Sequence, residues 1–171
     1  TRLGRIRRMR QLAAVALKTY GFGEARIRFV RQAGNTLFRV MTSDLPTPAA
    51  PEGLFEEGQY LLRVHEPGYQ EPEAIDLELT WLAAMRREAN LPVPEPIATL
   101  DGQWVTAIHV PGVPGTRHCS LLRWIKGRSV KNRFRPHHLQ AQGRLMARLH
   151  QFSIQWQPPA GLAKRKFAWD G

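Results

Sequence analysis

The feature that most constrains the fold of this chain is residues 60–65 (YLLRVH), a strand-like run of apolar residues that contains one arginine. Aromatic and β-branched residues favour a strand, and Pro67 and Gly68 directly after the run predict a turn. Side chains alternate between the faces of a strand, so Arg63 and His65 are expected opposite Tyr60, Leu62 and Val64. A buried guanidinium is costly unless an anion meets it. The candidate partners are a carboxylate on the next helix, a phosphate, or water.

The charges of the chain are unevenly distributed. The net charge is +11, yet Glu24 is the only acid before Asp44, and most of the 14 acids lie between Asp44 and Glu95. A second basic run covers residues 117–135. This layout suits an anionic ligand or partner, whether a nucleotide, a nucleic acid or an acidic part of the same protein. A solvated basic surface is the alternative for most of these residues.

Length and composition are those of an ordinary globular chain. Its 171 residues, 43% hydrophobic and 23% charged, fit one domain, or one small lobe with part of a second. No segment is apolar over enough residues to span a bilayer or to form the core of a secretory signal. Cys119 is the only cysteine, which excludes an internal disulfide and a cysteine-based zinc site. We therefore expect a cytoplasmic protein without membrane contact.

The spacing of apolar residues predicts three helices. The first covers residues 6–20 and ends at the glycines that follow, the second covers residues 73–88, and the third runs from about Pro136 to residue 152. The expected apolar face of the third helix consists of Leu139, Leu145, Met146 and Leu149. Between the second and third helices, the prolines of residues 91–96 impose an extended segment.

Alternating patterns and turn residues predict the strands. Residues 26–31 and 36–41 form a hairpin around the turn at residues 32–35, and residues 43–58 form a surface excursion. Residues 97–100 and 103–110 flank Asp101 and Gly102, which predicts a second hairpin. Residues 119–125 are a further strand. We expect an antiparallel sheet with the helices on one side.

The order of these elements and the residues at their joints resemble the aminoglycoside phosphotransferase and choline kinase-like superfamily, which shares the protein-kinase fold. The matching segments, in the order of that family, are 34–40 (GNTLFRV), 60–65 (YLLRVH), 76–82 (DLELTWL), 91–96 (LPVPEP), 122–128 (LRWIKGR) and 143–150 (GRLMARLH). The resemblance implies an α+β fold. Residues 1–122 correspond to a protein-kinase-like N-terminal lobe, residues 123–135 to the hinge, and residues 136–171 to the start of a C-terminal lobe.

The resemblance also assigns roles to particular residues. Arg63 stands where the third strand of the family carries a basic residue that contacts nucleotide phosphates, and Glu78 where the next helix carries the acid that holds it. Arginine in place of the usual lysine has a fork that meets carboxylate and phosphate together. Asn35 lies in the turn that corresponds to the phosphate-covering loop, although the chain has no Gly-x-Gly-x-x-Gly there. Backbone groups of Arg123 and Ile125 correspond to those that bind the adenine edge.

Each of these residues also has an ordinary structural interpretation. Arg63 can pack its stem on the sheet with its head in water, and Glu78 can be a surface acid of a helix. Asn35 suits the backbone of a turn whether or not it contacts a ligand.

The family's catalytic loop, roughly His-x-Asp-x-x-x-x-Asn, is absent from the sequence. His150 is followed by Gln151 and Phe152, and only Gly171 follows Asp170. The resemblance therefore implies that this chain supplies the ATP-binding part of a phosphotransferase, with no catalytic or metal-binding residues of its own. Mg²⁺ ligands, the catalytic base and the site for a small-molecule hydroxyl acceptor are expected in a missing C-terminal half, so we expect the chain alone to be inactive.

Two alternatives belong to other functional classes. One is a basic nucleic-acid-binding module, which predicts a steep dependence of binding on salt concentration, but no recognised nucleic-acid-binding motif is present. The other is a kinase-like scaffold that binds without catalysis. We expect a nucleotide rather than a nucleic acid as the partner.

Overall fold

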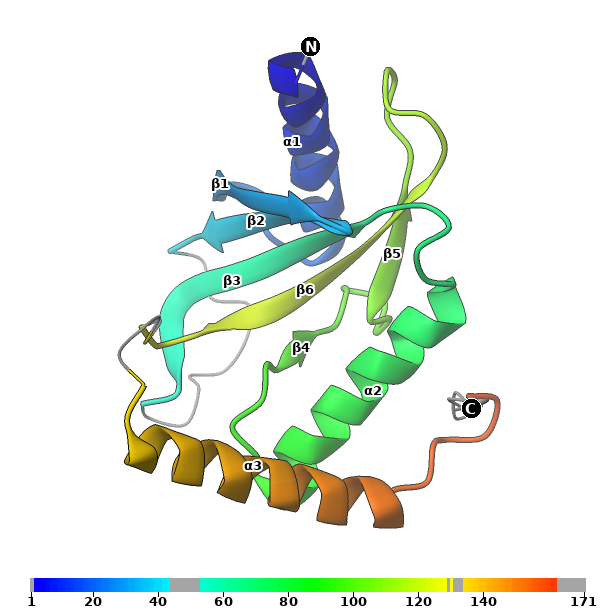
Figure 1. The fold of residues 1–171 in the computed structure, drawn as a ribbon. Coiled ribbons are helices and arrows are strands. Elements are labelled where there is room, and N and C mark those ends of the chain that lie inside the picture. The colour runs from blue at the N-terminus through cyan, green and yellow to red at the C-terminus, as the bar shows by residue number, and fades with distance from the viewer. Residues whose placement is uncertain (1, 44–52, 129, 131–133, 163–171) are drawn as a thin grey trace, which may run out of the picture.

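The structure is a computed structural model that describes residues 2–43, 53–128, 130 and 134–162 (Figure 1). Three helices and six strands lie within these residues. In chain order they are α1 Arg2–Thr19, β1 Arg26–Ala33, β2 Asn35–Met41, β3 Phe55–His65, α2 Pro72–Ala89, β4 Pro96–Ile97, β5 Val105–Ile108, β6 Arg117–Ile125 and α3 Pro136–Gln155. The three predicted helices and the strand that carries Arg63 are all present.

The strands form one antiparallel sheet in the order β1-β2-β3-β6-β4, with β5 also on β6. The first predicted hairpin is confirmed. β1 and β2 pair as far as Ala33 and Asn35, which leaves Gly34 alone between them with φ +70°. A positive φ is easy only for glycine, so this residue permits so tight a connection.

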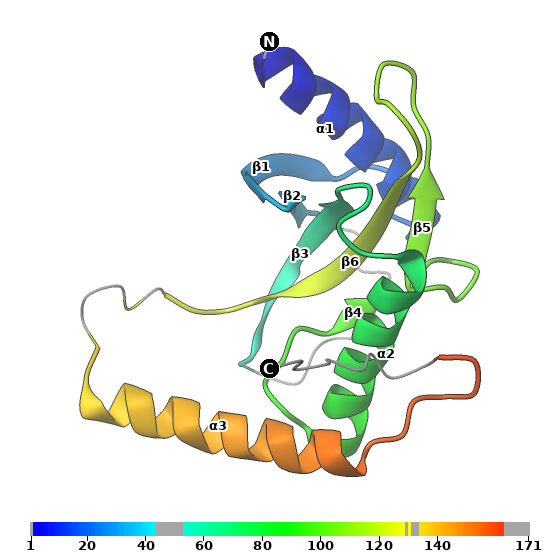
Figure 2. The same cartoon turned by 45° about the vertical axis from the view of Figure 1, so that its right-hand side comes forward.

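The two long helices beside the sheet lie on opposite faces, which corrects the prediction that all helices share one side. Tyr60, Leu62 and Val64 pack with α1 in the largest apolar cluster, whereas Leu61 and Leu122 pack with α2. β3 and β6 therefore have apolar residues at successive positions, and a strand with this pattern buries both of its faces. Figure 2 shows α1 and α2 apart, with β3 and β6 between them.

The predicted hairpin around Asp101 and Gly102 is wrong as a pair of strands. The local turn forms, with Gly102 at φ +82° and its N–H donating to the Thr99 carbonyl at 2.9 Å. However, β4 and β5 both pair with β6, where Ile97 lies opposite Leu121 and Val105 opposite the adjacent Ser120. The turn is the tip of a loop that interrupts one strand, because the edge of β6 provides a longer row of hydrogen-bonding partners.

β3 begins at Phe55, five residues earlier than Tyr60, so the end of the predicted surface excursion belongs to the sheet. Residues 44–52 of that excursion lie outside the described residues. α3 crosses the C-terminal end of α2 (Figure 1), and its predicted apolar face is divided. Leu145 and Leu149 pack against the cluster of Met85, Leu91 and Val93, whereas Leu139 and Met146 are exposed.

Candidate functional site

Arg63 and Glu78 form a bidentate ion pair between β3 and α2. The Arg63 Nη1 donates to Glu78 Oε1 at 2.7 Å and the Nη2 donates to Oε2 at 3.2 Å. The side chains are 15% and 33% exposed, so the pair is shielded from water but still open to a ligand. Two parallel bonds of this kind fix the plane of the guanidinium. The pairing that the sequence suggested is present.

The helix register explains why Glu78 meets the sheet. Ile75 and Leu79 lie one turn apart on α2 and are fully buried against Leu122 of β6. Residues three and four positions apart share a helix face, so Glu78 projects from the same side as Ile75. Arg63 uses two of its five N–H donors on Glu78, and its Nε is buried without a partner, so the second N–H groups of Nη1 and Nη2 are the donors that can meet an anion. The arrangement can therefore hold a phosphate without separating the pair.

His65 and Ser120 support this position, although sequence analysis assigned them no role. His65 is on the same strand face as Arg63, and Ser120 lies opposite Arg63 on β6. Both are buried, and His65 Nε2 is 3.0 Å from the Ser120 hydroxyl oxygen. Burial, with the charge of Arg63 as a second cause, lowers the pKa of His65 from 6.5 to about 4. The imidazole is therefore neutral at pH 7, and of Arg63, His65 and Ser120 only Arg63 is charged.

Asn35 anchors the hairpin turn to the end of β3. Its side-chain Oδ1 accepts the backbone N–H of Glu66 at 3.4 Å. The Glu66 carboxylate in turn lies 3.0 Å from Arg5 of α1 and 3.5 Å from Arg117 of β6. Asn35 thus has a structural contact in this structure, and its role toward a nucleotide remains a prediction.

Arg123 and Ile125 lie farther along β6. Arg123 is opposite Tyr60, three residues along the strand from the position of Arg63, or about 10 Å. Its backbone N–H donates to the Glu95 carbonyl at 2.8 Å, and its side-chain Nε is 3.2 Å from the Glu95 carboxylate. The Arg123 N–H is therefore already occupied. The predicted adenine contacts depend on other backbone groups of this segment and remain untested.

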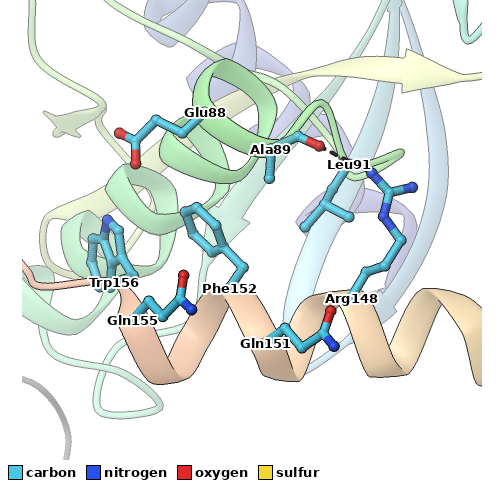
Figure 3. Close-up of a pocket in the computed structure, with 8 residues that line it drawn as sticks. All are labelled: Glu88, Ala89, Leu91, Arg148, Gln151, Phe152, Gln155 and Trp156. Carbon is cyan, nitrogen blue, oxygen red and sulfur yellow. Dashed lines mark hydrogen bonds between the residues drawn. The ribbon is translucent and has the colours of Figure 1, made fainter.

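A separate hollow of about 560 Å³ lies where α3 crosses the end of α2 (Figure 3). Arg148 closes one side by donating to the Ala89 carbonyl at 3.0 Å, and Phe152 and Trp156 provide aromatic surface. None of the five predicted nucleotide-binding residues lines it.

Across residues 2–43, 53–128, 130 and 134–162, no three His, Cys, Asp or Glu side chains are grouped so that they could hold a metal ion. None of the described helices combines the length and apolar character needed to cross a membrane.

Comparison with known proteins identifies the family. A sequence model of the phosphotransferase enzyme family matches residues 54–169, which is more than half of the chain. The chain belongs to this family. The match includes β3, α2 and β6, the elements that position Arg63 and Glu78. The resemblance to aminoglycoside phosphotransferases and related kinases that the sequence predicted is confirmed. No protein in a curated set matches the chain.

Two solved structures share the fold. A microcompartment-associated aminopropanol kinase is 28% identical with a TM-score of 0.70, over 93% of this chain. An amicoumacin kinase, in complex with AMP-PNP, Ca²⁺ and Ami, is 20% identical with a TM-score of 0.66, over 84% of this chain. This chain spans 45% and 39% of the lengths of those two proteins. The predicted α+β kinase-like fold is confirmed.

Proposed function

We propose that this chain is the nucleotide-binding N-terminal part of an ATP-dependent small-molecule kinase. The main support for this proposal is the Arg63–Glu78 ion pair, which joins a central strand to the adjacent helix in a chain of the phosphotransferase enzyme family. In this proposal residues 1–122 form the N-terminal lobe, residues 123–135 the hinge, and residues 136–171 the start of a C-terminal lobe. The protein would act in the cytoplasm.

The proposed role of Arg63 is to bind the inner phosphates of ATP. Glu78 holds the guanidinium in one orientation, so that less rotamer entropy is lost when the phosphates bind. ATP supplies the γ-phosphate for transfer to a hydroxyl group. Asn35 and backbone groups near Arg123 and Ile125 complete the proposed nucleotide contacts. The catalytic base and the ligands of Mg²⁺ belong, in this proposal, to a C-terminal part beyond this chain, so the chain alone would bind nucleotide without transferring phosphate.

The acceptor is proposed only as a small molecule with a hydroxyl group. One structure similar to this chain is an aminopropanol kinase, which makes an amino alcohol the first class of acceptor to test. The nucleic-acid alternative is less favoured, because several arginines of the basic runs contact acids of the chain itself. These are Arg5 and Arg117, which meet Glu66, and Arg123, which meets Glu95.

The decisive experiment measures nucleotide affinity by isothermal titration calorimetry. We expect Arg63→Met to weaken ATP binding about tenfold or more and to leave adenosine binding unchanged, because the loss of a charge-assisted bond to phosphate costs about 1.5–3 kcal/mol. Arg63→Lys is the matched control that keeps the charge, and it should retain much of the affinity. Equal ATP affinity in the parent chain and Arg63→Met would overturn the assignment.

A further inference from the structure

The sheet face that carries Arg63 also carries other arginines, among them Arg28, Arg31 and Arg39. Residues opposite one another in an antiparallel sheet share a face. Leu37 of β2 lies opposite both Arg63 of β3 and Arg31 of β1, so Arg31 and Arg63 belong to one row across the sheet. In the next row along the strands, Arg39 lies opposite both Arg28 and Leu61. The face therefore has a high density of positive charge.

These four arginines differ in what they contact. Arg63 is paired with Glu78, and Arg39 stacks over Trp124 at 4.5 Å from the ring centroid and donates to Gln59 at 2.6 Å. The side chains of Arg28 and Arg31 are exposed, and neither side chain forms an ion pair or hydrogen bond within the described residues. Among the residues that the structure describes, no acid therefore neutralises Arg31, which lies in the same row as Arg63. Two strand spacings, about 10 Å, separate their backbones, a gap that two long side chains can narrow.

The turn between β1 and β2 has little capacity to bind phosphate through its backbone. Phosphate-binding loops present several free N–H groups to the anion. Here Gly34 is the only residue between the last paired positions, and the ring of Tyr69 lies over it, since a Cβ on Gly34 would be 3.3 Å from that ring. A nucleotide on this face needs another source of positive charge beside Arg63.

We propose that Arg31 is a second phosphate-binding residue, which contacts the outer phosphates of the nucleotide whose inner phosphates meet Arg63. This inference rests on the proposed function and extends it. The charged side chain of Arg31 provides a phosphate contact that the backbone N–H groups of the tight turn cannot provide. As an exposed, flexible cation it needs no rearrangement of the sheet to approach the phosphates.

The test compares ATP, ADP and adenosine by calorimetry, with the whole 171-residue chain and its variants. Arg31→Gln should weaken ATP binding about tenfold, weaken ADP binding less, and leave adenosine binding unchanged. Arg31→Lys, which keeps the charge, should recover most of the loss. The matched control is Arg7→Gln, because Arg7 is an exposed arginine of α1, on the other side of the sheet, and the net charge changes equally. It should change none of the three affinities.

The outcomes separate this inference from the proposed function. If Arg63→Met weakens ATP binding but Arg31→Gln behaves as Arg7→Gln does, the inference is overturned and the proposed function stands. If Arg31→Gln lowers the affinities for ATP, ADP and adenosine equally, Arg31 supports the folded structure rather than contacting phosphate. The inference is then also overturned. If the parent chain binds ATP no better than adenosine, both fail.

Discussion

The two faces of the sheet differ in what they bury. The face toward α1 is a continuous apolar layer in which Leu12, Phe38 and Leu62 are fully buried. The face toward α2 has a smaller apolar cluster around Ile75 and Leu79, and it also carries charged and polar residues, among them Arg63 and His65. Apolar contacts are non-directional and provide stability, whereas a shielded ion pair such as Arg63–Glu78 is weak evidence for stability, because removing its charges from water is costly. The comparison indicates that one face holds the fold together and the other is available for binding.

The largest expected effect is on the α1 face. Phe38→Ala should lower the free energy of unfolding by about 3–5 kcal/mol, because it removes a fully buried ring and leaves a cavity. Leu61→Ala, on the α2 face and only partly buried, should cost less than half as much. Urea unfolding followed by circular dichroism measures both. If the two variants lose similar free energy of unfolding, the face toward α1 does not contribute more to stability than the face toward α2.

The second effect is a dependence of stability on pH that arises on the α2 face. His65 has its pKa lowered from 6.5 to about 4, so between these values the unfolded chain binds more protons than the folded chain. The free energy of unfolding should therefore fall as the pH is lowered from about 6.5 toward 4, by up to about 1.4 kcal/mol per pH unit.

Unfolding of the parent chain and of His65→Gln should be compared across this range. The variant should be less stable at pH 7 but should lose less stability on acidification. Parallel pH profiles for the two proteins would assign the acid sensitivity to other groups.

The smallest of these effects is expected at the turn that joins the two outer strands. Gly34→Ala should cost about 1–2 kcal/mol, because the residue has φ +70° and the new Cβ would crowd Tyr69. Thermal unfolding measures the loss. Gly115→Ala is the matched control, since Gly115 has the same φ, +70°, but no atom lies within 4 Å of the added Cβ. If the two variants lose equal stability, the contact with Tyr69 contributes nothing and only the backbone strain counts.

Much of the candidate site could be predicted because its determinants are local. The alternation in residues 60–65 placed Arg63 on the other strand face from Leu62 and Val64, and the spacing of apolar residues predicted the helix that carries Glu78. The resemblance to the phosphotransferase family then named Glu78 as the partner of Arg63. The structure then brought Arg63 and Glu78 within 2.7 Å of one another. The supporting pair of His65 and Ser120 was missed, since the two are 55 residues apart and only strand pairing joins them.

The sequence by itself determined the helices, the tight turn at Gly34 and the face to which Arg63 belongs, because periodicity and glycine conformation act over a few residues. Only the tertiary structure decided which strands pair, that α1 and α2 cover opposite faces, and that Glu95 engages the Arg123 N–H. In each of these cases segments that are far apart in the chain must meet: strands at a sheet edge, helices at a sheet face, or a carbonyl at a backbone N–H. The outcome depends on how the whole sheet buries its apolar area and satisfies its hydrogen bonds, which no local pattern contains.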